Sequence, residues 1–154
     1  MEIKELKNRP GIDQHKKLYA AYAQFDKLLM ELRAKELPNE TVNAINDGID
    51  RVNSVTESGK ELRKQIKNTQ SRIIKRIEKE HKLVTKNHYR NTWLAVGMTV
   101  FGLPLGVVFG TSLGNMAFLG MGLPIGMAIG IAVGAGMDKK AFEEGRQIDL
   151  EIDR

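Results

Sequence analysis

Charged residues are frequent along most of the chain but are absent from residues 91–137. This uncharged run of 47 residues is more than twice the ~20 apolar residues that cross a bilayer once. A cluster of turn-forming residues at 111–115 divides it. The pattern predicts two antiparallel membrane-spanning helices, over about residues 93–110 and 116–137. The alternative is an apolar hairpin buried inside a soluble protein.

Glycine recurs at every fourth position within both predicted helices. The two series belong to a direct repeat, since Gly-Leu-Pro-Leu-Gly at 102–106 returns as Gly-Leu-Pro-Ile-Gly at 122–126. Residues four apart lie on one helix face, and a face without side chains lets another helix approach closely. We therefore expect a helix-packing role for eight glycines: Gly102, Gly106, Gly110, Gly114, Gly122, Gly126, Gly130 and Gly134. Pro104 and Pro124 are expected to bend the two helices at matched positions.

These two series resemble the glycine zipper, a repeat of small residues found in many unrelated bacterial membrane proteins, among them channels and outer-envelope lipoproteins. The resemblance covers about residues 97–136. It implies tight helix packing, often with oligomerisation, in a bacterial membrane. It does not imply one activity, and it does not extend to residues 1–90.

Basic residues flank the uncharged run on its terminal sides, whereas the loop between the predicted helices carries no charge. The positive-inside rule therefore predicts cytoplasmic termini and an external loop at 111–115. The first eleven residues hold five charges and lack the apolar core of a signal peptide. We expect a multi-pass protein of the bacterial inner membrane.

The first 90 residues repeat large apolar residues at spacings of three and four, the pattern of helices that pack side by side. One helix is expected from Asp13, as N-cap, to Leu37. A second is expected from about residue 39 to 90, bent or broken near Ser58 and Gly59, and continuing into the membrane. The predicted seam consists of Leu18, Tyr22, Phe25, Leu29 and Leu32 in the first helix, and Ile45, Ile49, Val52, Leu62, Ile66, Ile73 and Ile77 in the second.

This seam is narrow, so two helices alone would bury too little to be stable. A second copy of the chain is the simplest source of further helices, which favours a homo-oligomeric coiled-coil stalk. The alternative is a loosely folded stalk held by the membrane.

Charge is segregated along this region. Residues 1–59 hold 9 basic and 10 acidic residues, whereas residues 60–90 hold 11 basic and 3 acidic ones. Anionic lipid headgroups would attract such a segment beside the bilayer. Nucleic-acid binding is disfavoured, because the basic segment has no aromatic residue among residues 60–88. A solvated face is the simplest alternative. Tyr89 and Trp93 fit an interfacial aromatic belt, and the candidate interface residues are Lys75, Arg76, Lys79, Lys82, Lys86, Tyr89, Arg90, Trp93, Lys139 and Lys140.

The last segment of the chain, residues 138–154, begins polar and ends with apolar and acidic residues alternating at 148–153. This alternation is a strand pattern, but a single strand is not stable alone. The tail is therefore expected to be disordered or to add to a sheet in a partner. Gly145 separates it from a short helical extension of the second membrane helix.

Catalytic and metal-binding chemistry is not indicated. The chain has no cysteine, and its three histidines are scattered, with His81 and His88 expected to share a helix face. The glycines lack the context of a nucleotide loop. We expect no cofactor, no small-molecule substrate and no enzyme activity.

The sequence thus predicts an all-α integral membrane protein, with a helical region at 1–90, a transmembrane hairpin at 91–137 and a tail at 138–154. The function expected is that of a membrane-anchored oligomeric structural protein whose helices or tail dock another protein. Two alternatives are a homo-oligomeric channel or membrane-perturbing effector, and a membrane tether for nucleic acid.

Overall fold

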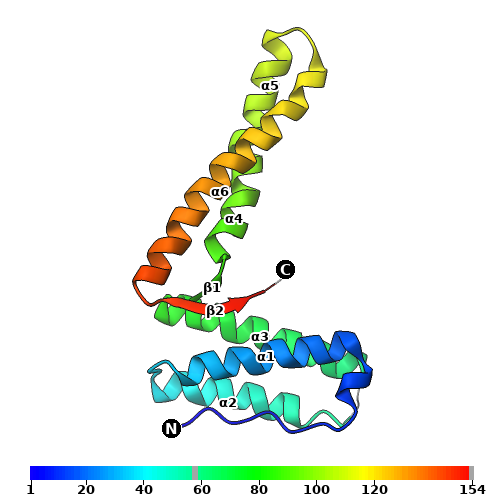
Figure 1. Cartoon of the computed structure of the whole chain (residues 1–154), viewed down its shortest axis with the longest axis vertical. Helices are drawn as coiled ribbons and strands as arrows, with labels where there is room; N and C mark the ends of the chain where they lie inside the picture. The colour runs from blue at the N-terminus through cyan, green and yellow to red at the C-terminus, as the bar shows by residue number, and fades with distance from the viewer. Residues whose placement is uncertain (57–58, 153–154) are drawn as a thin grey trace. The chain divides into compact units, whose positions relative to one another are not determined.

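A computed structural model describes residues 1–56 and 59–152, and it is mostly helical (Figure 1). The chain forms two compact units. The first comprises Met1–Val84 with Ile148–Leu150, and the second comprises Thr85–Gln147 with the residues from Glu151 onward. The first unit therefore ends near Val84, before the expected boundary at residue 90, and the tail is not a separate part.

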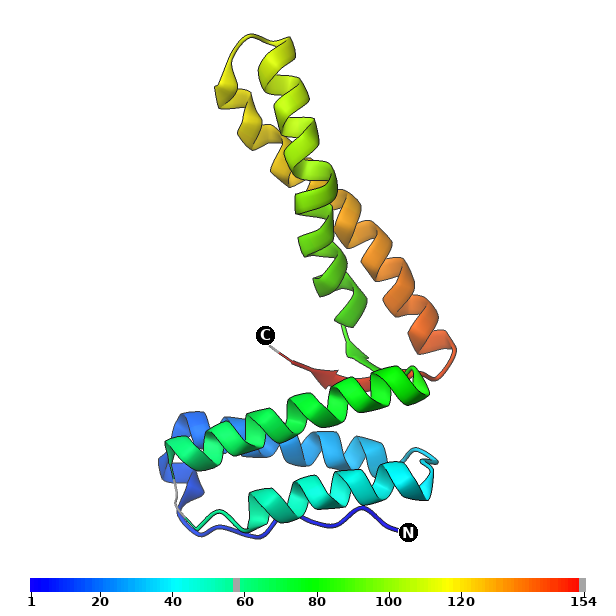
Figure 2. The ribbon, with the colours of Figure 1, turned by 180° about the vertical axis from the view of Figure 1, so that it is seen from behind.

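The first unit contains three helices, α1 (Lys16–Arg33), α2 (Asn39–Asn53) and α3 (Lys60–His81), where two were expected. α3 packs against both α1 and α2 (Figure 2). A short 3-10 helix, η1 (Ile12–Gln14), precedes α1. Asp13 lies within η1 and His15 occupies the N-cap of α1, so the N-cap expected at Asp13 is wrong.

The apolar spacing of these helices reflects one shared core. Each predicted seam residue is buried except Tyr22, which is half-buried. Leu28 is fully buried as well, and the heptad spacing did not include it. The core thus receives a wider face of α1 than a two-position seam provides.

The long second helix that we expected is interrupted twice. α2 ends at Asn53, and α3 starts after Gly59, whose φ of 136° is open to glycine alone; Ser58 lies outside the described residues. α3 then ends at His81 because Lys82 adopts a left-handed conformation with φ of 56°. The Leu83 amide donates to the Ile77 carbonyl, which closes the helix end. The first interruption agrees with the bend or break expected near Gly59, whereas the expected continuation of the helix from His81 to residue 90 is wrong.

The tail forms a strand, β2 (Gln147–Glu151), which pairs with β1 (Val84–Lys86). Ile148 and Leu150 are buried, as the alternating pattern requires. The strand's partner lies in the same chain, so the favoured disordered or partner-dependent interpretation is wrong. Asp153, the last residue of the pattern, lies outside the described residues.

The second unit is a helical hairpin. Its first arm runs through α4 (His88–Val96), the π-helical segment η2 (Gly97–Gly102) and α5 (Leu103–Ser112). Its second arm contains the 3-10 turn η3 (Met116–Phe118) and α6 (Leu119–Glu143), which packs along the whole first arm (Figure 1). The first arm begins at His88, before the predicted start at residue 93, and α6 continues to Glu143, as the expected helical extension before Gly145 requires.

The prolines act differently in the two arms. Pro104 has no amide hydrogen to donate to the Val100 carbonyl, and the π-helical η2, which contains Val100, ends two residues before this proline. α6 runs as one helix with Pro124 near its start. The two matched prolines therefore lie in different local structures, one just after a π-helical segment and the other inside an uninterrupted helix.

The three-helix core gives a direct prediction. Phe25 is fully buried and Tyr19, on the same helix, is 52% exposed. Replacing Phe25→Ala should lower the free energy of unfolding of the first unit by about 3–5 kcal/mol, because a cavity remains. Tyr19→Ala should change it by less than about 0.5 kcal/mol. Denaturant unfolding of the full chain in mild detergent, followed by circular dichroism, measures both, and equal losses would contradict the described core.

Candidate functional site: the glycine-packed hairpin

The two arms of the hairpin meet backbone to backbone along their glycines. A Cβ atom placed on Gly126 would lie 2.6 Å from the Gly102 Cα, and one on Gly134 would lie 2.5 Å from the Arg90 Cα. Carbon atoms do not approach this closely, so a side chain at either position would separate the arms. The same kind of contact joins Gly122 to Gly102 and Gly106, Gly126 to Gly97 and Gly102, Gly130 to Trp93 and Gly97, and Gly134 to Tyr89 and Arg90.

The ends of the glycine series depart from the expected packing. Gly110 faces the Met116 side chain, with a built Cβ 3.3 Å from its sulfur. Gly114 has a φ of 62° and no neighbour within 4 Å of a built Cβ, so its expected packing role is wrong. Gly114 instead forms the turn between the arms, where a left-handed conformation favours glycine.

Gly97 is a packing residue that the sequence analysis missed. It lies five residues before Gly102, and a search for four-residue spacing therefore passes over it. The segment between them is π-helical, and a π-helix brings residues five apart onto one face. The glycine face thus continues one turn further than the sequence repeat.

Large apolar side chains point away from this glycine seam. The helical stretches His88–Ser112 and Met116–Glu143 are each long and apolar enough to cross a membrane. Only 22% and 17%, respectively, of the most apolar 18-residue segment of each stretch is buried. Helices in the core of a soluble protein bury their large side chains instead. The exposed large apolar residues of the hairpin are Val100, Phe101, Leu103, Val107, Val108, Leu113, Met116, Met121, Ile125, Ile129, Ile131, Val133, Met137 and Phe142.

The threonines of the first arm do not offer free hydroxyls. The hydroxyls of Thr92, Thr99 and Thr111 donate to the carbonyls of His88, Ala95 and Val107, at 2.9, 3.1 and 2.9 Å. Each bond stays within one helix, so these polar atoms are satisfied without water or a partner.

Asp138 of α6 closes the open end of the hairpin. Its side chain is buried, and its two carboxylate oxygens accept the amides of Tyr89 and Arg90 at 3.0 and 2.9 Å. α4 begins at His88, so these amides have no partner within the helix. A carboxylate also complements the positive end of the helix dipole. Asp138 therefore caps one arm from the other.

Sequence reasoning missed Asp138 because the capped amides lie almost fifty positions earlier in the chain. The one available signal was its place as the first charge after the uncharged run. The Gln147 side chain adds a bond of 3.3 Å to the Asp138 carbonyl.

The candidate interface residues of the second unit lie near this end. Lys139 and Lys140 pair with Glu143 and Glu144, one helical turn away, at 3.8 and 3.9 Å. These four side chains are largely exposed, so the pairs contribute little to stability. Both lysines therefore remain accessible to solvent or headgroups.

The aromatic candidates take part in the hairpin itself. The Tyr89 ring meets His88 edge to face, with centroids 5.0 Å apart. The Arg90 guanidinium lies 3.7 Å from the Glu151 carboxylate. Trp93 is half-buried and gives its carbonyl oxygen to the Gly130 contact. These residues thus combine a place at the helix start with a packing role.

The candidates of the first unit fall into two groups. Lys75 and Lys79 are exposed on α3. Arg76 instead forms ion pairs with Glu80 at 2.9 Å and Glu40 at 3.1 Å. The hydrogen bond to Glu80 raises the pKa of Arg76 above its ordinary value. Lys82 ends α3 in its left-handed conformation, and Lys86 ends β1.

The two central histidines do not share a helix face, which corrects that expectation. His81 ends α3, where its Nε2 lies 2.8 Å from the Thr41 hydroxyl, and His88 begins α4. Over residues 1–56 and 59–152, no group of three His, Cys, Asp or Glu side chains is placed to hold a metal ion.

Comparison of the chain with protein-family models, curated proteins and solved structures finds no match.

The glycine seam predicts different outcomes for neighbouring positions on α6. Gly134→Ala places a methyl group against the Arg90 backbone and should destabilise the hairpin by about 1–3 kcal/mol. Gly136→Ala is the matched control, because no atom lies within 4 Å of its built Cβ. It should be neutral or stabilising by up to ~1 kcal/mol, since alanine favours helices. Emission from Trp93, the single tryptophan, during detergent denaturation reports hairpin opening. Equal stability of both variants would contradict the seam.

The Asp138 cap predicts a graded response. Asp138→Ala leaves two amides unpaired and should cost about 1–3 kcal/mol, whereas Asp138→Asn keeps one accepting oxygen and should cost less. Lys139→Ala, at an exposed neighbouring position, is the control. The same Trp93 measurement ranks the variants. An Asp138→Ala protein as stable as the control would exclude the cap as a stabilising contact.

Proposed function

We propose that this protein is a membrane-anchored interaction protein. The hairpin of the second unit spans a bilayer twice, and the first unit is a folded cytoplasmic module that assembles with other proteins. Both termini lie in the cytoplasm of a bacterium, and the turn at 113–115 lies outside. The protein needs no cofactor and performs no catalysis in this role.

The observation that carries this proposal is the inverted packing of the hairpin. Its smallest residues are inside, and its large apolar side chains are exposed on both arms. In water such a surface would drive aggregation, whereas lipid chains cover it at no cost. Packing through glycine suits lipid, because helices there associate through close contact between backbones.

The orientation rests on the charges at the hairpin's ends. Lys139 and Lys140 follow one arm, Lys86 and Arg90 lie at the start of the other, and the turn has no charge. This distribution favours a cytoplasmic position for the charged ends. The exposed lysines of α3 add a surface that anionic headgroups attract.

A channel receives less support from this arrangement. The glycine seam leaves no space between the two arms, and the threonine hydroxyls bond within their own helix. A pore would have to be lined by apolar side chains of several hairpins. Nucleic-acid tethering depends on the same lysines as headgroup attraction and has no additional contact in its favour.

The glycine seam also bears on assembly. Its glycines are occupied within one hairpin, so they close the hairpin instead of joining copies. The proposed homo-oligomer therefore requires a different surface, which we place on the first unit.

Membrane topology tests the proposal. Single substitutions Asn8→Cys, Leu113→Cys and Glu143→Cys place thiols at exposed positions of a chain that lacks cysteine. In intact bacterial cells, a membrane-impermeant maleimide should label position 113 alone. In permeabilised cells it should label all three, which controls for reactivity. Labelling of position 8 or 143 in intact cells would disprove the orientation, and recovery of the protein in the soluble fraction would disprove the anchor.

A further inference from the structure

The start of the chain is held by side chains that bind its main chain. Residues 1–9, here called the strap, run beside α2 (Figures 1 and 2). The Asn46 amide nitrogen donates to the Glu2 carbonyl at 3.0 Å, and its oxygen accepts the Lys4 amide at 2.8 Å. Asn46 thus brackets Ile3 as a neighbouring β-strand would.

Asn53 repeats this arrangement further along the strap. Its side chain donates to the Glu5 carbonyl at 3.2 Å and accepts the Lys7 amide at 2.8 Å, and so brackets Leu6. Asn46 and Asn53 therefore bind the main chain of the strap at two successive places, each side chain donating one hydrogen bond and accepting one.

The spacing of the two brackets matches in helix and strap. Asn46 and Asn53 are seven residues apart, about 10 Å along a helix. Ile3 and Leu6 are three residues apart, also about 10 Å along an extended chain. An extended peptide of any origin can therefore meet both asparagines in register.

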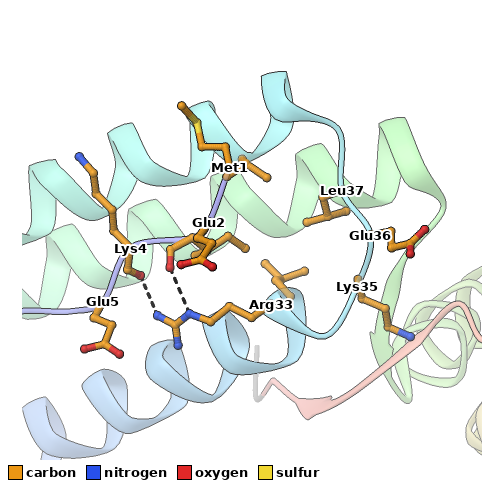
Figure 3. A pocket seen from close by; sticks show the side chains of 11 residues that line it. Met1, Glu2, Lys4, Glu5, Arg33, Lys35, Glu36 and Leu37 are labelled. Atoms are coloured by element: carbon orange, nitrogen blue, oxygen red, sulfur yellow. Dashed lines mark hydrogen bonds between the residues drawn. The ribbon is translucent and has the colours of Figure 1, made fainter.

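α1 completes the groove from the other side. The Arg33 guanidinium donates to the carbonyls of Ile3 and Lys4, at 3.2 and 2.7 Å (Figure 3). The Tyr22 hydroxyl donates to the Lys7 carbonyl at 2.7 Å. Burial is the main cause that raises the pKa of Tyr22, so the hydroxyl stays protonated as a donor.

Two strap side chains add contacts specific to its sequence. Lys4 pairs with Asp50 at 2.7 Å. The Arg9 guanidinium donates to the carbonyl of Val52, in the last turn of α2, at 3.0 Å, and to that of Val55, just beyond the helix, at 2.7 Å. The groove therefore prefers a peptide with the strap's own order of residues.

The strap nevertheless makes few buried apolar contacts. Ile3 is its one buried side chain, and a cavity of about 860 Å³ remains beside its first five residues (Figure 3). A segment with few buried apolar contacts opens at little cost relative to the folded core. Opening of the strap uncovers the Asn46 amide, which another extended main chain can bind through the same two hydrogen bonds.

We propose that this groove binds the strap of a second copy of the chain, so that two copies join by exchanging residues 1–9. Every contact above is the same whether the strap comes from its own chain or from another, which is the condition for segment exchange. The hinge lies between the strap and α1, where Gly11 adopts a φ of 80°. The proposal names the assembly contact of the proposed function, and it does not depend on the hairpin crossing a membrane.

A cross-linking experiment on the full chain in mild detergent tests the exchange. One variant carries Lys4→Cys and another carries Asp50→Cys, at half-exposed positions that are in contact through their side chains. The two are co-expressed with different tags and treated with a short bis-maleimide. The double variant Lys4→Cys/Asp50→Cys is the control for reach within one chain.

Exchange predicts a cross-linked dimer carrying both tags, lost when Asn46→Ala and Asn53→Ala are added to the Asp50→Cys chain. Cross-linking confined to the single chain of the double variant would overturn the proposal. A mixed dimer that survives the asparagine substitutions would overturn it too, because another surface would have brought the copies together. Failure of the membrane anchor would appear in the thiol labelling of intact cells and not in this assay.

Discussion

The tightest packing described in this structure is between the backbones of the two hairpin arms, which meet along the glycine seam. A Cβ atom on Gly126 or Gly134 would overlap the backbone of the first arm, so the arms can stay this close only if both residues are glycine. The seam then fixes where every other side chain of the hairpin goes. If the inside is reserved for backbone, the valines, isoleucines and methionines must lie outside. A hairpin built in this way has no apolar interior of its own, so its stability depends on surroundings that accept an apolar surface.

The seam also explains why the hairpin is locked at its open end. Contacts between backbones are short in range and carry no charge. They therefore set the distance between the two arms better than they set the position of one arm along the other. Asp138 supplies a fixed register by bonding two particular amides of α4, and the turn around Gly114 supplies the other end. Between these points, the π-helical η2 shifts the first arm so that Gly97 and Gly102 share the packing face.

Periodicity in the sequence predicted what depends on spacing alone. It located the buried faces of α1, α2 and α3 and the glycine series, because helical geometry converts spacing directly into a face. It failed where a single backbone angle or a distant partner decides the outcome. The left-handed Lys82 ends α3 where charge and apolar spacing would allow it to continue. The strand at Ile148–Leu150 was visible as an alternation, but its pairing with β1 depends on contacts far along the chain. The roles of Asn46, Asn53 and Asp138 were invisible for the same reason.

The strap and the hairpin are both held by contacts to the main chain, but they differ in whether a second copy of the chain could make the same contacts. The hairpin arms are joined by a turn of a few residues and meet through glycines, so their contact is tightly constrained within one chain. The strap contacts residues of α2 that lie more than forty positions further along the chain. The hydrogen bonds from the groove to the strap's main chain would be the same if another copy supplied the strap. Loop closure over such a distance gives the chain's own strap a limited advantage, which falls as the local concentration of other copies rises. In the proposed membrane-anchored state, confinement to the bilayer raises that concentration. The same fold can therefore combine a fixed anchor with an exchangeable contact, because the two depend on different lengths of intervening chain.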